Sequence, residues 1–413
     1  MATTAGSTHG APRAGWLAGF AALGLAASAA STRVHHQILN DPTYASFCDV
    51  NETFSCTVAY TSRFGSVAGV PVALLGLLFF AFVLLVIAIS ARSRAGENLP
   101  GYVFAASTIG LAVVLYLGYA SFFVLQTLCV LCLATYVAVV GLFVTSGTAT
   151  GNLISSLPGR AMRDLQLLFR TPSALGALVL FLAASAAAVV MLREPVAAAA
   201  ESASPSAAAV QQAIPTASAA QLKQLEDYLA AQPRKVVAAP SDGAVIVILK
   251  FNDYQCPGCG QTHRDYKPVI AKWAQQAPGK VKFISKDYPL ERECNAFVAT
   301  DLHLGACEAA VAVRLAKEKG KGEAMEEWLF KNQPAMNPDT VRKAAASVGG
   351  VTDFDKRYAA TLELVKADIT QGAQLKIGGT PTFFLNGMQL PGLRAEFFDA
   401  AIAWELKRVT GGK

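Results

Sequence analysis

Charged residues are scarce in this chain. Only 15% of its 413 residues are Asp, Glu, Lys or Arg, whereas about a quarter of the residues of a soluble globular protein are charged. Hydrophobic residues make up 53%, so the composition predicts that much of the chain faces lipid. The chain also lacks a repeat of fixed period and a basic stretch interleaved with aromatic residues, so we expect no nucleic-acid partner.

The apolar residues are concentrated in runs close to the ~20 residues that cross a bilayer. Four runs are nearly unbroken and cover 67–91, 101–124, 128–147 and 174–192, and a weaker run covers about 15–32. The weaker run could be a cleaved signal peptide, but it lacks a strongly basic start and a further span follows it. We therefore expect a retained first helix and an all-α membrane bundle with a four-helix core plus a fifth helix.

Basic residues in two short loops orient this bundle. They are Arg92 and Arg94 in one loop, and Arg160, Arg163 and Arg170 in the other. The positive-inside rule places both loops in the cytoplasm. The loop 33–66, the turn near Gln126 and everything after Glu194 are therefore expected outside.

The composition divides the chain into four segments. Residues 1–150 are predicted to form the four-helix core, and 151–192 a cytoplasmic loop with the fifth helix. Residues 193–233 are rich in Ala, Ser and Pro, which is typical of a flexible linker, and end in a short helical piece. Residues 234–413 read as strand, helix, strand, helices, strand and helix, which predicts an α/β domain with a helical insertion.

Cysteines are absent from the predicted cytoplasmic loops. The chain has eight: Cys48, Cys56, Cys129, Cys132, Cys256, Cys259, Cys294 and Cys307. On this topology each lies outside or at the outer membrane surface. Disulfides persist in such oxidising compartments, so the distribution predicts disulfide chemistry.

Cys256 and Cys259 form a CxxC motif between a predicted strand and a predicted helix. A helix N-terminus lowers the pKa of a thiol, and the thiolate is the nucleophile in disulfide exchange. We therefore expect a lowered pKa for Cys256, with Cys259 resolving the mixed disulfide. The alternative is half of a zinc site, because CxxC is also a metal-binding spacing. The residues that could complete such a site are Cys294, Cys307, His263 and His303.

A second motif, Gly379-Thr380-Pro381, enters a predicted strand far downstream of the CPGC sequence. The two motifs together resemble the thioredoxin superfamily over about 234–410, and most of all its DsbA-type branch. The resemblance implies a cis-proline beside the CxxC motif, with Thr380 and Pro381 docking the backbone of a substrate protein, and it disfavours zinc. It also implies a structural or accessory disulfide between Cys294 and Cys307, with a relay role as the alternative.

The remaining cysteines lie in the predicted membrane region. Cys129 and Cys132 form a CxxC motif where a membrane helix starts at the outer surface, and Cys48 and Cys56 are close enough in the outer loop to form a disulfide. A lone membrane cysteine is usually an inert small hydrophobe, and a loop disulfide can be purely structural. Two pairs on the oxidising side favour a redox role over these alternatives.

The two pairs also have characteristic neighbours. The sequence TSRFG covers 61–65, shortly after Cys56, and Thr135 and Tyr136 follow Cys132. With these neighbours the chain resembles the vitamin K epoxide reductase family over roughly 13–147. Bacterial members of that family fused to a thioredoxin-like domain have the same domain order.

This resemblance implies an order of electron transfer. The Cys48–Cys56 disulfide would oxidise the CxxC pair of the thioredoxin-like domain, Cys129 would take the electrons from the loop, and Cys132 would face a quinone. The family pattern favours Cys56 as the loop cysteine that faces the thioredoxin-like domain.

The hydroxyls of Ser62 and Tyr136 are candidates for hydrogen bonds to the quinone or to Cys132. The alternative for both residues is ordinary helix packing.

The resemblance therefore implies a disulfide-forming oxidoreductase that spans the bacterial inner membrane several times, with its thioredoxin-like domain in the periplasm. The implied cofactor is a quinone, ubiquinone or menaquinone, and no metal is expected. The implied partners are the membrane quinone pool, the lipid bilayer and reduced periplasmic protein thiols. The alternatives are a quinone or quinone-epoxide reductase driven by the fused domain, and a redox-inert membrane binding module stabilised by disulfides.

Overall fold

The computed structural model describes most of the chain in two compact units. The described residues are 11–44, 46–49, 54–90, 98–125, 127–150, 157–194, 214–299 and 301–411. The predicted turn at Gln126, the loop with Arg92 and Arg94 and much of the predicted linker (195–213) lie outside them. The first unit comprises Met1–Gln37 and Phe54–Val196, and the second Ile38–Thr53 and Ala197–Lys413.

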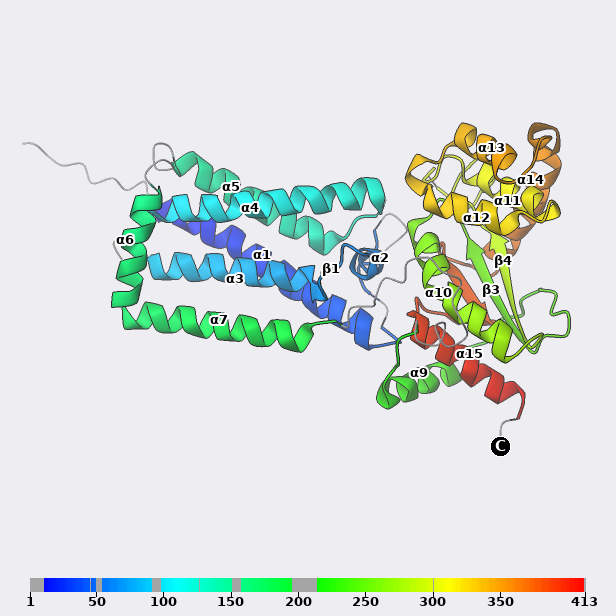
Figure 1. Cartoon of the computed structure of the whole chain (residues 1–413), viewed down its shortest axis with the longest axis horizontal. Coiled ribbons are helices and arrows are strands. Elements are labelled where there is room, and N and C mark those ends of the chain that lie inside the picture. Colours follow the sequence, from blue (N-terminus) through cyan, green and yellow to red (C-terminus); the bar gives the residue numbers. More distant parts are fainter. Residues whose placement is uncertain are drawn as a thin grey trace, which may run out of the picture. The chain divides into compact units, whose positions relative to one another are not determined.

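The first unit is built of helices with one short hairpin (Figure 1). Its helices are α1 (Ala11–Asn40), α2 (Cys56–Thr61), α3 (Val72–Ser90), α4 (Leu99–Tyr119), its π-helical extension η2 (Ala120–Val124), α5 (Val130–Thr150), α6 (Leu157–Arg170) and α7 (Pro172–Leu192). The strands β1 (Ser66–Val67) and β2 (Val70–Pro71) form the antiparallel hairpin.

Five helices of this unit are long and apolar enough to cross a membrane, which confirms the prediction of five apolar helices. They cover Gly15–Asn40, Val72–Ser90, Leu99–Val124, Val130–Thr148 and Pro172–Leu192. The first helix continues eight residues past the predicted run 15–32. Residues 33–40 contain neither Pro nor Gly to end it.

Four of these helices share one core. Leu17 of α1, Phe80 of α3, Val103 of α4 and Leu142 of α5 are among its buried members. In contrast, α7 has no buried residue, so it stands apart from the core as the expected fifth helix.

The helix α6 was not predicted, because its sequence was interpreted as a cytoplasmic loop. Its Asp164 accepts hydrogen bonds from the Tyr102 hydroxyl at 2.6 Å and the Asn98 amide at 2.8 Å. Arg160 also donates to the Asn98 side chain at 3.2 Å. These contacts attach α6 to the start of α4.

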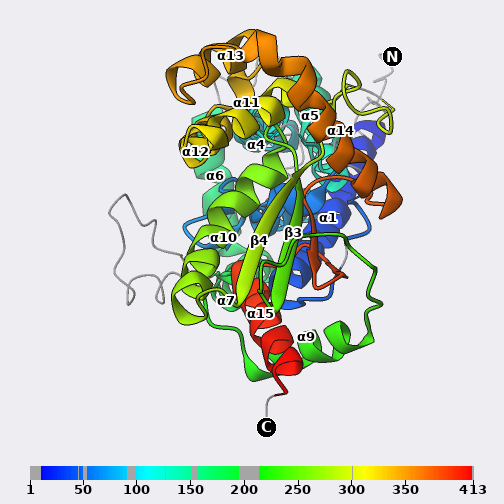
Figure 2. The same ribbon diagram turned by 90° about the vertical axis from the view of Figure 1, so that its right-hand side faces the viewer.

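The second unit contains a four-stranded sheet with the order β4-β3-β5-β6 (Figure 2). Its strands are β3 (Ile246–Asn252), β4 (Val281–Asp287), β5 (Thr382–Leu385) and β6 (Met388–Leu390). Strand β4 is parallel to β3, whereas β5 is antiparallel to β3 and β6 to β5. The helices are α9 (Ala219–Ala231), α10 (Pro257–Gln276), α11 (Ala306–Glu318), α12 (Gly322–Lys331), α13 (Pro338–Ser347), α14 (Phe354–Gln374) and α15 (Ala395–Val409).

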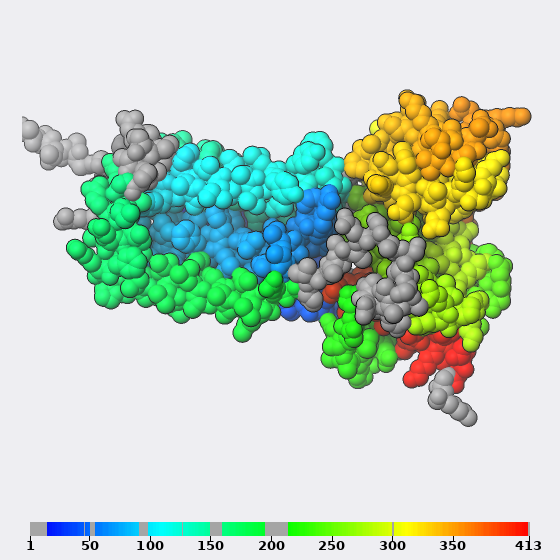
Figure 3. Space-filling view, viewed as in Figure 1, coloured from blue at the N-terminus to red at the C-terminus, as the bar shows by residue number. Residues whose placement is uncertain are grey.

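Side chains of the central strand β3 enter two cores. Leu249 and Phe251 pack with the inserted helices α11 to α14, which form a lobe of their own in the space-filling view (Figure 3). Ile246 and Ile248 point to the other face of the sheet, because successive side chains in a strand alternate, and pack with α9, α10 and α15. The prediction of an α/β domain with a helical insertion is confirmed.

Two elements of this unit refine what the sequence indicated. Helix α9 lies within the predicted linker, but its Leu225 and Leu229 are buried in the core with α15. Strand β6 follows the predicted Asn-Gly turn, in which Asn386 and Gly387 both have positive φ (46° and 83°), as a two-residue hairpin requires.

Candidate redox sites

The membrane CxxC motif lies where α2 meets the start of α5. The backbone N–H of Ser55 donates to the Leu128 carbonyl at 3.0 Å, and Phe54 pairs with Leu128 in a β-bridge. Cys56 follows Ser55 and Cys129 follows Leu128 in the sequence, so these contacts place the two cysteines side by side. As a result the Cys56 and Cys129 sulfur atoms are 3.4 Å apart.

The cysteines of this region are in two redox states. Cys48 and Cys56 are both disulfide-bonded, whereas Cys129 and Cys132 are reduced. The expectation that Cys56 is the loop cysteine turned to the thioredoxin-like domain is wrong in this structure, because Cys56 is buried against Cys129.

Hydrogen bonds surround the Cys129 sulfur. Its thiol donates to the Tyr60 hydroxyl at 3.3 Å, and the sulfur accepts the backbone N–H of Cys132 at 3.2 Å. The hydrogen bond with the Cys132 side chain lowers the pKa of Cys129, burial opposes this, and the bond with Tyr60 lowers the pKa further. Cys129 is therefore the activated thiol of the membrane pair.

A cavity of about 660 Å³ opens beside this pair between α1, α3, α4 and α5. Cys129, Cys132 and Tyr136 line it together with mainly apolar side chains. The Ser28 hydroxyl also lines it and has no hydrogen-bond partner among the described residues. Buried polar atoms are normally paired, so this wall is suited to an apolar molecule that carries a hydrogen-bond acceptor.

The structure brings Tyr136 to the cavity but not Ser62. The Ser62 hydroxyl donates to the Ala59 carbonyl at 2.8 Å and accepts the backbone N–H of Phe64 at 3.2 Å. It stabilises the turn after α2. Ser28 was missed, because an isolated serine in an Ala-rich helix carries no motif.

The second CxxC motif joins β3 to α10, with Cys256 as the N-cap residue. The Cys256 thiol donates to the Thr380 carbonyl at 3.3 Å, and the peptide bond between Thr380 and Pro381 is cis. Both cysteines are reduced and buried. The structure therefore brings together the two motifs of this domain that lie more than 120 residues apart in the sequence.

The expectation of a lowered pKa for Cys256 is wrong for this closed, reduced site. The hydrogen bond with Cys259 and burial raise the pKa of Cys256 well above its ordinary value, while the positive charge of His303 lowers it. The effect of the helix N-terminus is outweighed, because burial disfavours the charged thiolate and the neighbouring Cys259 opposes a second negative charge.

Buried polar residues that the sequence did not single out surround this pair. The Asp253 carboxylate accepts the backbone N–H groups of Gln255 at 2.7 Å and Leu290 at 2.8 Å, and is paired with His303 Nδ1 at 2.8 Å. The Cys259 sulfur accepts the backbone N–H of Asp253 at 3.4 Å. The Asp253–His303 pair thus connects the motif to a distant loop, which no local spacing could indicate.

A lysine lies behind the motif. Lys250 is 5% exposed, and its ammonium donates to the Cys259 carbonyl at 3.2 Å. Burial lowers the pKa of Lys250, and the charges of Cys259 and Cys256 act against this. A buried cation at this place favours the thiolate form of the pair.

The structure does not assemble the alternative zinc site. Cys294 and Cys307 form a disulfide with a Cα–Cα distance of 6.1 Å, so neither offers a thiolate. His303 is paired with Asp253, and His263 contacts the Phe330 ring at 4.5 Å between ring centroids.

Comparison with known families gives two matches on this chain. The model of the vitamin K epoxide reductase family matches residues 15–147, and a thioredoxin model matches residues 239–403. Together they include both CxxC motifs. Subunit 1 of the mouse vitamin K epoxide reductase complex is 30% identical over 136 residues, which are 30% of this chain and 81% of that protein.

Two further similar proteins each match less than half of this chain. A Na(+)/H(+) antiporter of Salinispora tropica is 26% identical over 157 residues, but this chain spans only 22% of that antiporter's length. Among solved structures, oxidised BdbD from Bacillus subtilis is 24% identical with a TM-score of 0.32. That match covers 43% of this chain and 96% of BdbD.

Proposed function

This chain belongs to the vitamin K epoxide reductase family and carries a thioredoxin-like domain, and we propose that it is a membrane enzyme that passes electrons from protein thiols to a quinone. The 3.4 Å contact between the sulfur atoms of Cys56 and Cys129 carries the proposal. Disulfide exchange requires that a thiolate reach a disulfide sulfur directly. The partner cysteine, Cys132, lines the cavity beside this contact.

Exchange between the loop and the membrane pair uses four cysteines. When the loop is reduced and the membrane pair oxidised, the Cys56 thiolate attacks Cys129 Sγ and Cys132 leaves as a thiolate. The Cys48 thiolate then attacks Cys56 Sγ and Cys129 leaves, so the loop disulfide forms and two electrons remain on the membrane pair. A disulfide-bonded loop beside reduced Cys129 and Cys132 is the product state of this transfer.

The cavity residues fit a quinone. Its walls are mainly apolar, as an isoprenoid quinone requires, and the Ser28 hydroxyl offers an unused hydrogen bond. A bound ubiquinone or menaquinone would supply an acceptor for two electrons and two protons. Cys132 is the thiol that would give up the electrons, Ser28 and Tyr136 would hold the molecule, and Ser62 would keep the turn beside it in place.

The thioredoxin-like domain is the proposed entry point for electrons. Cys256 and Cys259 would oxidise reduced periplasmic protein thiols and be reoxidised by the loop disulfide, with Thr380 and Pro381 docking the substrate backbone. The Cys294–Cys307 disulfide would lie outside this relay.

We assign 1–150 as the membrane core, 151–192 as loop and fifth helix, 193–233 as linker and 234–413 as the thioredoxin-like domain, with the helix α9 at the end of the linker packed on that domain. The five apolar helices support a location in the bacterial inner membrane, with the last domain in the periplasm.

The test is quinone reduction by the purified full chain in detergent, with a reduced protein substrate. We expect Cys132→Ala to abolish quinone reduction while Cys256 and the loop cysteines still exchange with substrate. The matched control is Thr148→Ala, since Thr148 is an exposed residue at the other end of α5. Equal activity of wild type and Cys132→Ala would refute the proposal and favour a redox-inert module.

A further inference from the structure

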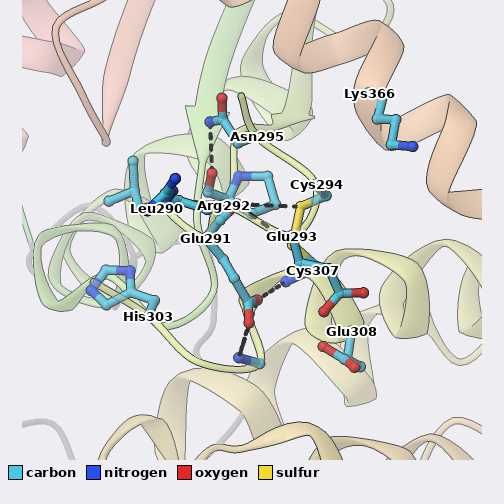
Figure 4. The surroundings of a disulfide bond; sticks show 12 residues. Leu290, Glu291, Arg292, Glu293, Cys294, Asn295, His303, Cys307, Glu308 and Lys366 are labelled. Carbon is cyan, nitrogen blue, oxygen red and sulfur yellow. Dashed lines mark hydrogen bonds between the residues drawn. A yellow bond between two sulfur atoms is a disulfide. The ribbon is translucent and has the colours of Figure 1, made fainter. Parts of the chain in front are cut away.

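Three carboxylates meet beside the Cys294–Cys307 disulfide, away from both CxxC motifs in the sequence. One oxygen of each of Glu291, Glu293 and Glu308 lies within 4.8 Å of the others. Glu291 and Glu293 belong to the loop after β4, and Glu308 to the first turn of α11. Figure 4 shows the carboxylates of Glu293 and Glu308 pointing toward one another near the disulfide.

Burial distinguishes this cluster from ordinary surface acids. Glu291 is 5% exposed and Glu308 is 2% exposed. The Glu291 oxygens accept the backbone N–H groups of Gly305 and Cys307 at 2.9 to 3.1 Å. Burying carboxylates together is costly unless a positive charge compensates them.

Among the residues that the structure describes, the positive charge in contact with the cluster does not balance it. Arg342 contacts one oxygen of Glu308 at 3.0 Å, and the Tyr358 hydroxyl, which is neutral, donates to Glu293 at 2.7 Å. The other Glu308 oxygen is buried and has no hydrogen-bond partner among the described residues. Three carboxylates with one guanidinium leave two negative charges.

The disulfide itself assembles the cluster. Glu293 directly precedes Cys294, and Glu308 directly follows Cys307. The disulfide holds the two cysteine Cα atoms 6.1 Å apart across a sequence separation of 13 residues. Without it, the loop that carries Glu291 and Glu293 loses its covalent attachment to the start of α11.

We propose that Glu291, Glu293 and Glu308 bind a hard divalent cation of the Ca²⁺ type, and that the site exists only while Cys294 and Cys307 are oxidised. Carboxylate oxygens are the ligands that Ca²⁺ prefers, and a flexible set of them completed by water suits its irregular coordination. Two uncompensated negative charges match a divalent ion. The proposal departs from the expectation of no metal, which weighed only cysteine and histidine ligands.

The coupling between metal and disulfide is reciprocal. If reduction of the disulfide to two thiols by an added dithiol weakens metal binding, the bound metal must make that reduction harder by the same factor. The metal would thus protect the accessory disulfide in a domain whose neighbouring cysteines exchange continuously.

Calorimetric titration of the full chain in detergent with Ca²⁺ alone tests the site. We expect one Ca²⁺ per chain with a Kd of about 10⁻⁴ to 10⁻³ M, the range of extracellular modules. Glu308→Gln and Glu293→Gln should each weaken binding by about tenfold or more. Glu318→Gln is the matched control, because Glu318 lies on the same helix and pairs with Arg357 at the surface.

A second experiment separates the site from general folding defects. The Cys294→Ser/Cys307→Ser double variant should lose Ca²⁺ binding while its circular dichroism stays that of a folded chain. Tb³⁺ excited through tyrosine should luminesce in the wild type and be displaced by Ca²⁺, and Tyr358→Phe should reduce the luminescence at saturating Tb³⁺. Glu293 is exposed, so a folding defect cannot explain weaker binding by its Gln variant.

Three results would overturn the proposal. These are no saturable Ca²⁺ binding at millimolar concentration, equal affinity in wild type and Glu308→Gln, and undiminished binding by the double cysteine variant.

Discussion

Removal of a single hydroxyl, in the variant Tyr60→Phe, tests how Cys129 is activated. Tyr60 is buried, its ring is stacked on His35 at 5.2 Å, and its hydroxyl contacts the Cys129 sulfur at 3.3 Å. Phenylalanine keeps the ring and the stacking but cannot hydrogen-bond. The variant therefore removes only what the hydroxyl contributes and keeps the packing of the ring.

The size of the effect follows from that one hydrogen bond. A hydrogen bond to a charged group contributes about 1.5–3 kcal/mol, and one pKa unit corresponds to about 1.4 kcal/mol. The bond stabilises the thiolate, so its loss should raise the pKa of Cys129. Under the proposal, quinone reduction re-forms the Cys129–Cys132 disulfide, a step in which Cys129 must act as a thiolate. At neutral pH its thiolate fraction should fall about 10- to 100-fold, and the rate of quinone reduction about 3- to 10-fold, because a more basic thiolate is also more nucleophilic.

The assay is the pH dependence of quinone reduction by the purified chain. We expect the alkaline-rising limb of the profile to move to higher pH, so that activity recovers partly at high pH. Tyr102→Phe is the matched control, because its hydroxyl bonds to Asp164 on α6 and not to a cysteine. A fall in rate without a shift of the profile would refute the argument, since it would indicate a packing defect.

Further predictions concern the second unit. Lys250→Met removes the buried cation behind Cys259 and should lower the reduction potential of the pair, by about 30 mV for each 1.4 kcal/mol of lost thiolate stabilisation, as measured by equilibration with glutathione. Burial alone raises the pKa of Glu405, but hydrogen bonds from Arg408, Arg234 and Asn386 outweigh it and lower that pKa. The resulting stability is therefore present above the unfolded pKa and lost as the pH falls through the folded one, so Glu405→Gln should flatten the dependence of Tm on pH below about 5. Leu229→Ala should destabilise the unit by about 2–5 kcal/mol in denaturant unfolding, whereas Lys223→Ala on the exposed side of the same helix should have little effect.

The architecture was predictable because its signals are local or repeated many times. Apolar runs of membrane length identify the five long helices, and strand-like and helical patterns identify the α/β domain. The helix α6 was missed, because its apolar residues are interrupted by charges and its attachment depends on the distant residues Asn98 and Tyr102. Strand β6 was missed, because three residues are too few to form a pattern.

The candidate sites were predictable only where the reactive residues form a short sequence motif. Both CxxC pairs and the motif at Pro381 have fixed spacing. No sequence motif marks Ser28, Lys250 or the Asp253–His303 pair. Tertiary packing alone places Ser28 at the cavity and the other residues beside the second CxxC motif. The prediction that Cys56 faces the thioredoxin-like domain was wrong for the same reason. The contact of Cys56 with Cys129 depends on the pairing of Ser55 with Leu128, which are far apart in the sequence.

The same local motif would serve two different steps of the proposed relay, because the second cysteine has different surroundings in the two pairs. In both pairs the first cysteine precedes a helix and contacts a possible partner, which is Cys56 for Cys129 and the Thr380 carbonyl for Cys256. The second cysteine lies one turn deeper. Cys132 lines a cavity of about 660 Å³, so a small acceptor can reach it.

Cys259 is fully buried. Its sulfur accepts a hydrogen bond from the backbone N–H of Asp253, and its carbonyl accepts one from the Lys250 ammonium. Under the proposed function, this pair would exchange electrons through Cys256 with another protein thiol. Protein thiols would then enter the relay at the second unit, and electrons would leave to a small acceptor at the first. Under this proposal, a substitution that exposes Cys259 should disturb the entry of electrons from protein thiols. A substitution that closes the cavity wall at Cys132 should stop the transfer of electrons to the small acceptor.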